Sequence, residues 1–315
     1  MKSFTSTFEA GGPILTDGGI ETRIMFETSI RMDPDVQVAA MLADPQGREA
    51  LRSIYAGYVD AAKQFDLPVI IGTPTFRASR NFTELAGMPE SSVDEMNRDA
   101  VAFHREIRDA SGHDRVFIAG VLGPSGDAYL PEEALPVAGA AGYHRPQAEA
   151  LAGAGADFLF APTFPSVDEA QGACRAMADT GLPHVISYVL GPDHRVLDGN
   201  SLAQAIDQID SDPDARPLYH SLSCIHPVAA GQAVELLRRE SQEGYHRLAE
   251  FKANGSPLRT DELIKLDHPE TDSPELFARE IFALYDPEGL RVLGGCCGTG
   301  QDHMLALAEL LTTRD

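Results

Sequence analysis

Residues 218–238 read LYHSLSCIHPVAAGQAVELLR and contain one complete strand-to-helix unit. Leu218–Leu222 is predicted as a short strand, and Ala229–Arg238 is predicted as an amphipathic helix. Pro227 lies at the junction, where proline typically marks a turn. Cys224 lies at the C-terminal end of this strand, which is the end where a parallel barrel presents side chains to ligands.

The same alternation of short apolar runs and longer amphipathic stretches extends in both directions along the chain. Strands are predicted at Ile14–Thr16, Val69–Gly72, Val116–Val121, Phe158–Ala161, Val185–Val189, Leu218–Leu222, Leu248–Ala253 and Leu290–Leu293. Helices are predicted at Pro45–Ala62, Val93–Ala110, Gln147–Ala154, Val167–Met177, Ala203–Ile209, Ala229–Arg238, Pro274–Leu284 and Gln301–Leu311.

Eight strand–helix units in series predict an α/β fold that closes as a single (β/α)8 TIM-type barrel. The strands read as apolar throughout, as expected when both faces of a parallel sheet are covered. We expect one domain over residues 1–315, with insertions in the strand-to-helix loops at Tyr129–Ala141 and Ser256–Thr271. These loops belong to the end of a barrel where active sites lie.

The composition excludes several classes of partner. The 315 residues include 48 Asp and Glu against 25 Lys and Arg, for a formal net charge of −23. We expect no nucleic-acid and no membrane partner, because phosphate groups repel such a surface and no apolar run approaches the roughly 20 residues that span a bilayer. The first residues lack the apolar core of a signal peptide, and four cysteines are too few for a secreted disulfide scaffold. We therefore expect a cytoplasmic protein with free thiols.

Two further cysteines lie side by side in Leu293-Gly294-Gly295-Cys296-Cys297-Gly298-Thr299, at the C-terminal end of the last predicted strand. Closure of a barrel brings this end close to Cys224. Neighbouring side chains of a strand point in opposite directions, so two adjacent cysteines can share one ligand only if the backbone leaves the strand there. The three glycines of this segment are predicted to supply the necessary backbone freedom.

Three thiols at matching strand ends favour a site for one soft metal ion such as Zn²⁺, with a fourth position left for a substrate. Two other interpretations remain open for the Cys296–Cys297 pair, namely a core or redox role and a glycine loop that binds phosphate. A phosphate site, however, has no need of two thiols. Cys174 lies in a predicted helix and is interpreted as a core residue.

The cysteine segments resemble the homocysteine S-methyltransferase family, whose pattern is Gly-Gly-Cys-Cys-Gly-Thr near the C-terminus and Asn-Cys upstream. Gly294–Thr299 matches the first part fully, and Ser223 stands in place of the Asn. The resemblance covers nearly the whole chain. It includes further stretches at Leu15–Thr22, Thr73–Ser79, Leu197–Gly199 and Lys252–Asn254.

The resemblance implies that Cys224, Cys296 and Cys297 hold Zn²⁺ as the catalytic centre. It also implies methyl transfer from a sulfonium, an ammonium or a methylated cofactor to a small-molecule thiol, with homocysteine as the usual acceptor and methionine as the usual product. Three alternatives stay open: a methyltransferase or demethylase for a different thiol or carrier, a non-catalytic zinc- or corrinoid-binding module, and a metal-free phosphate-binding barrel. The identity of the donor and the oligomeric state are also open, a homo-oligomer included.

Substrate contacts are expected from residues that follow the first, second and seventh strands. By resemblance, Asp17 and Gly18 contact the amino acid part of the acceptor and Glu21 serves the donor, while an Asx-type turn or a solvent-exposed position is the alternative. The other expected contacts are Thr73, Phe76 and Asn254. His226, two residues after Cys224, is a candidate partner of the metal ligands, although a ligand role for it is not favoured.

Three residues depart from the pattern of the family. Pro162 stands where the family carries a Glu that holds the acceptor's ammonium, and Pro74 and Ser223 are the other two changes. Proline offers neither a charge nor an N–H group. The expected zinc chemistry is unaffected, but these changes predict an acceptor that lacks the usual amino acid head group or is held differently.

Overall fold

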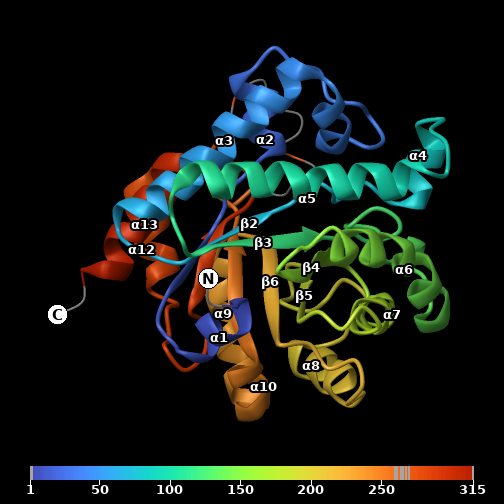
Figure 1. The fold of residues 1–315 in the computed structure, drawn as a ribbon. Coiled ribbons are helices and arrows are strands. Elements are labelled where there is room, and N and C mark those ends of the chain that lie inside the picture. Colours follow the sequence, from blue (N-terminus) through green and yellow to red (C-terminus); the bar gives the residue numbers. More distant parts are fainter. Residues whose placement is uncertain (1–2, 259–261, 263–265, 267, 269, 314–315) are drawn as a thin grey trace.

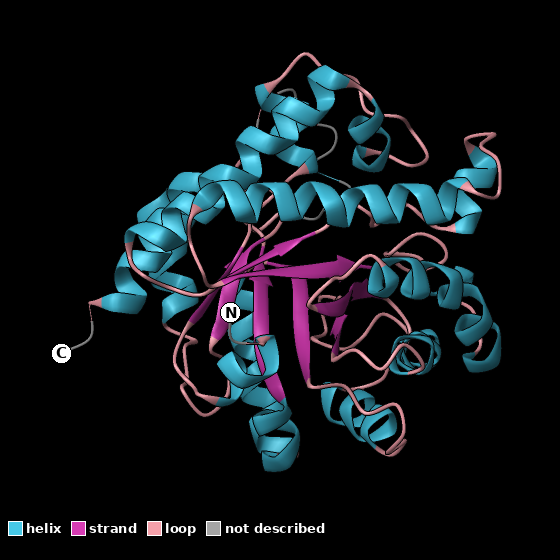
Figure 2. Cartoon of the chain, in the orientation of Figure 1, coloured by secondary structure: helices cyan, strands magenta, loops and turns pink. Residues whose placement is uncertain are grey.

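The structure is a computed structural model that describes residues 3–258, 262, 266, 268 and 270–313. Eight parallel strands close into a barrel in the order β1 to β8, with β8 paired to β1, and the helices lie outside the strands (Figures 1 and 2). The strands are β1 Ile14–Thr16, β2 Val69–Gly72, β3 Val116–Val121, β4 Phe158–Phe164, β5 His184–Tyr188, β6 Tyr219–Ile225, β7 Leu248–Ala253 and β8 Val292–Gly295. The predicted (β/α)8 barrel is confirmed.

Helices follow the strands around the barrel. They are α1 Phe4–Glu9, α2 Glu21–Glu27, α3 Pro45–Gln64, α4 Arg80–Leu85, α5 Ser92–Ser111, α6 Val137–Gly153, α7 Val167–Ala178, α8 Leu202–Asp210, α9 Pro227–Glu240, α10 Gln242–Arg247, α12 Pro274–Phe282 and α13 Gln301–Thr312, with short 3₁₀ turns η1 Val38–Ala43 and η2 Pro131–Glu133. Among the described residues, no helix is long and apolar enough to cross a bilayer.

The predicted insertion Tyr129–Ala141 is wrong in its last five residues, because α6 begins at Val137 rather than at Gln147. Pro146 lies inside this helix and, with the small residues before it, hides the helical pattern. Packing overrides the local signal. A Cβ atom on Gly172 of α7 would lie 2.5 Å from the Cβ of Ala140, so small residues let the two helices approach closely.

The second predicted insertion, Ser256–Thr271, is described only in part. Residues 259–261, 263–265, 267 and 269 lie outside the described residues. Gly255, just before this segment, contacts the loop after β8, since its N–H donates to the carbonyl of Cys297 at 2.9 Å.

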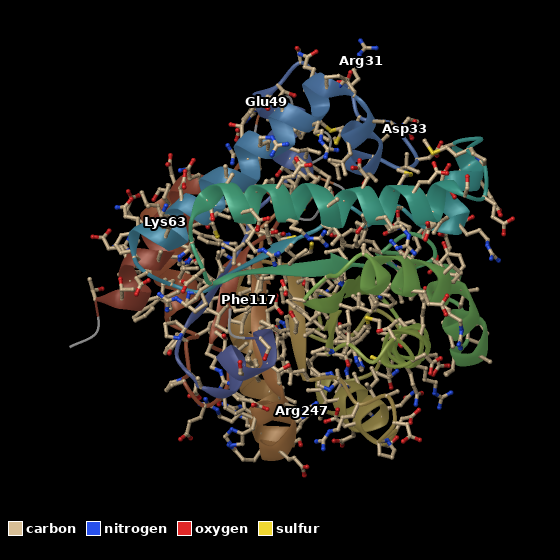
Figure 3. The ribbon with its side chains drawn as sticks, viewed as in Figure 1. Arg31, Asp33, Glu49, Lys63, Phe117 and Arg247 are labelled. Atoms are coloured by element: carbon tan, nitrogen blue, oxygen red, sulfur yellow. The ribbon has the colours of Figure 1, made fainter. Side chains whose placement is uncertain are left out.

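Two apolar layers hold the barrel. The larger one packs the outer faces of the strands against the helices. The smaller one fills the interior of the barrel toward the N-terminal ends of the strands. Helix α1 closes the N-terminal end of the barrel, where Phe4 stacks on Phe158 with ring centroids 4.0 Å apart. Phe117, which is labelled in Figure 3, belongs to the same interior layer, while Arg31 and Glu49 lie on the outer surface.

The interior of the barrel toward the C-terminal ends of the strands, here called the upper interior, is polar. This corrects the prediction of strands that are apolar throughout. Ser223 of β6 and Ser187 of β5 are buried, and their hydroxyl oxygens lie 2.6 Å apart. Glu250 and Lys252 come from β7. Buried polar groups are tolerated where they pair with one another, and this polar layer lies directly below the mouth of the barrel.

Candidate active site

The three cysteines predicted to act together lie together at the mouth of the barrel. The Sγ atoms of Cys224, Cys296 and Cys297 all lie within 4.8 Å of one another, and those of Cys224 and Cys296 are 2.7 Å apart. All three are free thiols and are partly exposed. Cys174 is buried in α7, as predicted for a core residue.

Cys224 reaches this cluster through an irregularity in β6. Its φ is +60°, a left-handed conformation that costs free energy for any residue except glycine. The register between β6 and β7 shifts between Ser223 and Ile225, on either side of this residue. Such a bulge redirects a side chain at the end of a strand, and here it brings the thiol to the mouth of the barrel.

Cys296 and Cys297 follow directly after the end of β8 at Gly295. The chain then turns, with the carbonyl of Cys296 accepting hydrogen bonds from the backbone N–H of Thr299 at 3.2 Å and from its hydroxyl at 2.8 Å. Gly298 has a φ of +78° and supplies the left-handed residue of this turn. The backbone therefore leaves the strand at the cysteines, as predicted.

The predicted role of Gly294 and Gly295 as flexible residues is wrong, because both lie inside β8 and provide space instead. A Cβ atom would lie 2.0 Å from the Thr16 hydroxyl oxygen at Gly294 and 2.1 Å from that of Thr299 at Gly295. Only glycine lets these neighbours approach so closely. The same two hydroxyl groups hold β1 and the Cys296 turn in place.

Proton sharing links the three thiols. Hydrogen bonds from Cys296 and Cys297 lower the pKa of Cys224, and the same contacts raise the pKa values of Cys296 and Cys297. The hydroxyl groups of Thr163 and Tyr129 also interact with Cys224, that of Thr163 at 4.0 Å. One thiolate is thus stabilised by its neighbours, whereas removal of all three protons requires a nearby cation.

Asp17, predicted as an acceptor contact, is paired with a residue that the sequence did not single out. Its Oδ2 accepts a hydrogen bond from the N–H of Gly72 at 2.7 Å, and its Oδ1 contacts the Nζ of Lys252. Burial raises the pKa of Glu250 to about 7, and the positive charge of Lys252 opposes this increase. A lysine within a predicted covered strand was the available signal, because unpaired charges are rarely buried.

Gly18 lies in the loop after β1, and Glu21 is the first residue of α2. Gly18 packs closely, since a Cβ atom there would lie 2.9 Å from both the Thr299 and the Tyr58 hydroxyl oxygens. Burial raises the pKa of Glu21, and the neighbouring charges of Cys296 and Asp17 raise it further. Both residues are therefore close to the cysteine cluster, and their roles in substrate binding stay predictions.

The remaining expected contacts differ in what they have available for a ligand. The hydroxyl group of Thr73 lies 2.7 Å from that of Thr75 and accepts from the N–H of Val121 at 2.9 Å, so it joins β2 to β3. Phe76 is partly buried. Asn254 is 3% exposed, and among the described residues its buried Oδ1 has no hydrogen-bond partner.

His226, the histidine considered from the sequence, has structural partners. The Nε2 of His226 lies 2.8 Å from Asp272, and its Nδ1 accepts a hydrogen bond from the N–H of Val228 at the start of α9. A further histidine, His144, lies in the middle of α6, and its Nε2 lies 3.1 Å from the buried Glu169.

Comparisons with known proteins point to one family. The family profile described as homocysteine S-methyltransferase matches residues 14–311. Betaine–homocysteine S-methyltransferase 1 of Danio rerio is 24% identical over 96% of this chain and 74% of its own length. Homocysteine S-methyltransferase of Escherichia coli K12 is 23% identical over 93% of this chain and 94% of its own length.

Solved structures show the same fold. Metallated homocysteine methyltransferase MmuM from Escherichia coli superposes with a TM-score of 0.77 and 19% identity over 96% of this chain and 98% of its own. Its oxidised form gives a TM-score of 0.78 over 96% and 97%. Fold, site and profile define an enzyme of the S-methyltransferase class. The chain belongs to the homocysteine S-methyltransferase family.

Proposed function

We propose that this enzyme transfers a methyl group from a sulfonium or ammonium donor to a thiol in a zinc-dependent reaction. The observation that carries the proposal is the cluster of three thiols from two strand ends, all within 4.8 Å of one another. The names of the relatives make homocysteine, with methionine as the product, the first acceptor to test.

The donor set fits zinc. Zn²⁺ bound by thiolates has Zn–S distances of about 2.3 Å, and tetrahedral geometry then separates the sulfur atoms by about 3.8 Å, within the spread of the cluster. Sulfur ligands select soft ions such as Zn²⁺. We propose Cys224, Cys296 and Cys297 as the three protein ligands, with one position left for the acceptor. Zn²⁺ bound there would keep an acceptor thiol deprotonated at neutral pH.

The chain's own residues prepare and align the reactants. The acceptor sulfur supplies an electron pair to the methyl carbon and forms an S–C bond, while the donor's bond to that carbon breaks and its electron pair stays on the donor heteroatom. The thiol proton leaves to solvent. Holding the two reactants in line at the barrel mouth can lower the activation barrier by roughly 7–11 kcal/mol.

The residues around the cysteines are proposed to position the substrates. Six residues make up this set: Asp17, Gly18, Glu21, Thr73, Phe76 and Asn254. Asn254 has the clearest support, because its buried Oδ1 lacks a partner among the described residues. Glu21 lies on the side of the donor in this proposal, where a carboxylate attracts a cationic sulfonium or ammonium group.

Metal analysis of the purified protein tests the zinc site. We expect about one zinc per chain, retained in a Cys174→Ala variant and lost in a Cys297→Ser variant that keeps its circular dichroism spectrum. Zinc content unchanged by the Cys297 substitution would contradict the site. A methyl-transfer assay with sulfonium and ammonium donors then tests the reaction, and a protein that binds zinc but methylates no thiol would be a non-catalytic module.

A further inference from the structure

The ion pair between Lys252 and Asp17 lies in the polar upper interior of the barrel, below the mouth. Both oxygens of the Asp17 carboxylate are engaged, one by the N–H of Gly72 and the other by the Nζ of Lys252. The side chain of Asp17 is only 5% exposed, whereas that of Lys252 is 13% exposed. Lys252 is therefore the more exposed side chain of the pair.

Lys252 is also close to the thiol cluster. Its strand neighbour in β8 is Gly294, two residues before Cys296, and the backbone N–H of Cys296 donates to the carbonyl of Ala253 at 2.7 Å. A thiol held at the cysteines thus has its tail within reach of the lysine.

The surroundings oppose a second ammonium at this position. A ligand ammonium could contact Asp17 only by displacing Lys252, which would remain buried without its partner at a considerable cost. The chain's own lysine already occupies the place beside the carboxylate.

Glu250, the other acidic group that acts on Lys252, competes weakly for it. Burial raises the pKa of Glu250 to about 7. This carboxyl group therefore holds a proton at higher pH than an exposed glutamate does. This weakens the repulsion that an incoming anion would meet, and Arg77 adds a second cation beside Glu21.

We propose that Lys252 selects the acceptor by its head group: the thiol carries a carboxylate or similar anion toward Lys252 and has no ammonium beside it. This inference rests on the proposed function, because it names the acceptor class of the same site. Homocysteine fits such a site less well than the same carbon chain without its amino group. The head group then anchors the acceptor while its sulfur lies at the cysteines.

Three thiols with the same carbon spacing but different head groups test the inference by calorimetric titration of the zinc-loaded enzyme. They are homocysteine, 4-mercaptobutanoate, which lacks the ammonium, and 3-aminopropane-1-thiol, which lacks the carboxylate. We expect 4-mercaptobutanoate to bind at least about tenfold more tightly than homocysteine, and 3-aminopropane-1-thiol to bind most weakly. A wild-type enzyme that prefers homocysteine to 4-mercaptobutanoate by a similar factor would overturn the proposal.

Variants of Lys252 provide a second readout. Lys252→Met frees the Asp17 carboxylate, so the preference should shift toward homocysteine and 3-aminopropane-1-thiol by at least about tenfold. Lys63→Met, at an exposed lysine on α3, should keep the wild-type order. If Lys252→Met does not fold, Lys252→Arg keeps the positive charge and must retain the wild-type order. An unchanged order in a folded Lys252→Met variant would contradict selection by this lysine.

Binding and turnover separate the two proposals. If 4-mercaptobutanoate binds best but no thiol is methylated with any donor, the proposed function fails while the head-group selection stands. If thiols are methylated but homocysteine is both bound and used best, the proposed function stands and the selection by Lys252 fails.

Discussion

At the scale of single residues, the site depends on where side chains are absent as much as on where they are present. Gly294 and Gly295 leave room for the hydroxyl groups of Thr16 and Thr299, and the second of these holds the Cys296 turn. Cys224, in contrast, accepts a strained backbone in order to face the other thiols. The two glycines directly precede Cys296, and the strained backbone belongs to Cys224 itself.

Gly295→Ala should disrupt the cysteine turn. The new methyl group would lie 2.1 Å from the Thr299 hydroxyl oxygen and 2.9 Å from the Met304 methyl carbon. Thr299 is 1% exposed and cannot move aside easily, so overpacking should lower the free energy of unfolding by about 1–3 kcal/mol and weaken zinc binding.

The matched control is Gly142→Ala, on the exposed side of α6, where a Cβ atom meets nothing within 4 Å. This change should raise the free energy of unfolding by about 0.5–1 kcal/mol, because alanine favours a helix over glycine. Urea denaturation of both variants measures the two effects. Equal effects of the two substitutions would show that space beside Thr299 is unimportant.

Glu250 should make the stability depend on pH. Burial raises its pKa in the folded state from 4.5 to about 7, so between these values the folded protein holds a proton that the unfolded chain has lost. The free energy of unfolding therefore falls as the pH rises through this window, by up to about 3 kcal/mol for this group.

A Glu250→Gln variant removes this titration and should lose less stability than the wild type between pH 5.5 and pH 8. Urea denaturation at both pH values measures the difference, and Glu49→Gln, at an exposed position on α3, is the control. If wild type and Glu250→Gln show the same pH dependence, Glu250 titrates at its ordinary pKa in the folded protein.

At the scale of elements, the short helix α1 closes the end of the barrel opposite the thiols. Phe4 is 1% exposed and packs on Phe158, Phe117 and Tyr219, and Phe8 stacks on Tyr219 with centroids 4.7 Å apart. This six-residue helix has little stability of its own. Its apolar face is held by the interior layer that it covers.

Phe4→Ala should therefore destabilise the whole barrel by about 3–5 kcal/mol, the cost of a large cavity in a core. Zinc content should stay at the wild-type level because the substitution lies at the far end of the strands. Phe282→Ala, at a partly buried ring on α12, should cost less. Urea denaturation gives both values, and a cost for Phe4→Ala no larger than that for Phe282→Ala would show that α1 does not close the core.

At the scale of the whole molecule, the acidic surface opposes compactness. The formal net charge of −23 is distributed over 315 residues, and the described basic groups are largely engaged in ion pairs with neighbouring carboxylates. The excess of negative charge favours solubility and attracts cationic molecules, but its self-repulsion lowers the stability of the folded chain.

Added salt should stabilise the protein for this reason. Raising the ionic strength from about 0.02 M to about 0.5 M shortens the screening length to a few ångström, and the melting temperature should rise by about 2–5 °C. Differential scanning calorimetry in NaCl and in choline chloride at equal ionic strength should give similar rises. A melting temperature that falls in both salts would show that attractive surface pairs outweigh the net repulsion.

Much of the fold follows from patterns within short windows of sequence. Four strand ranges, including Val116–Val121 and Leu248–Ala253, agree with the prediction at both ends, because a run of apolar residues bounded by turn residues is a local signal. The start of α6 at Val137 was missed, because its stability comes from packing on α7 rather than from its own residues.

By itself the sequence determined the barrel, the family and the three thiols, because alternation and spacing are carried by residues close in the chain. Only the tertiary structure decided which distant groups meet. Lys252 and Asp17 are separated by 235 positions, and their contact, like the left-handed Cys224, exists only once the barrel has closed. Local patterns set which elements form, whereas closure of the barrel sets which charges must pair in its interior.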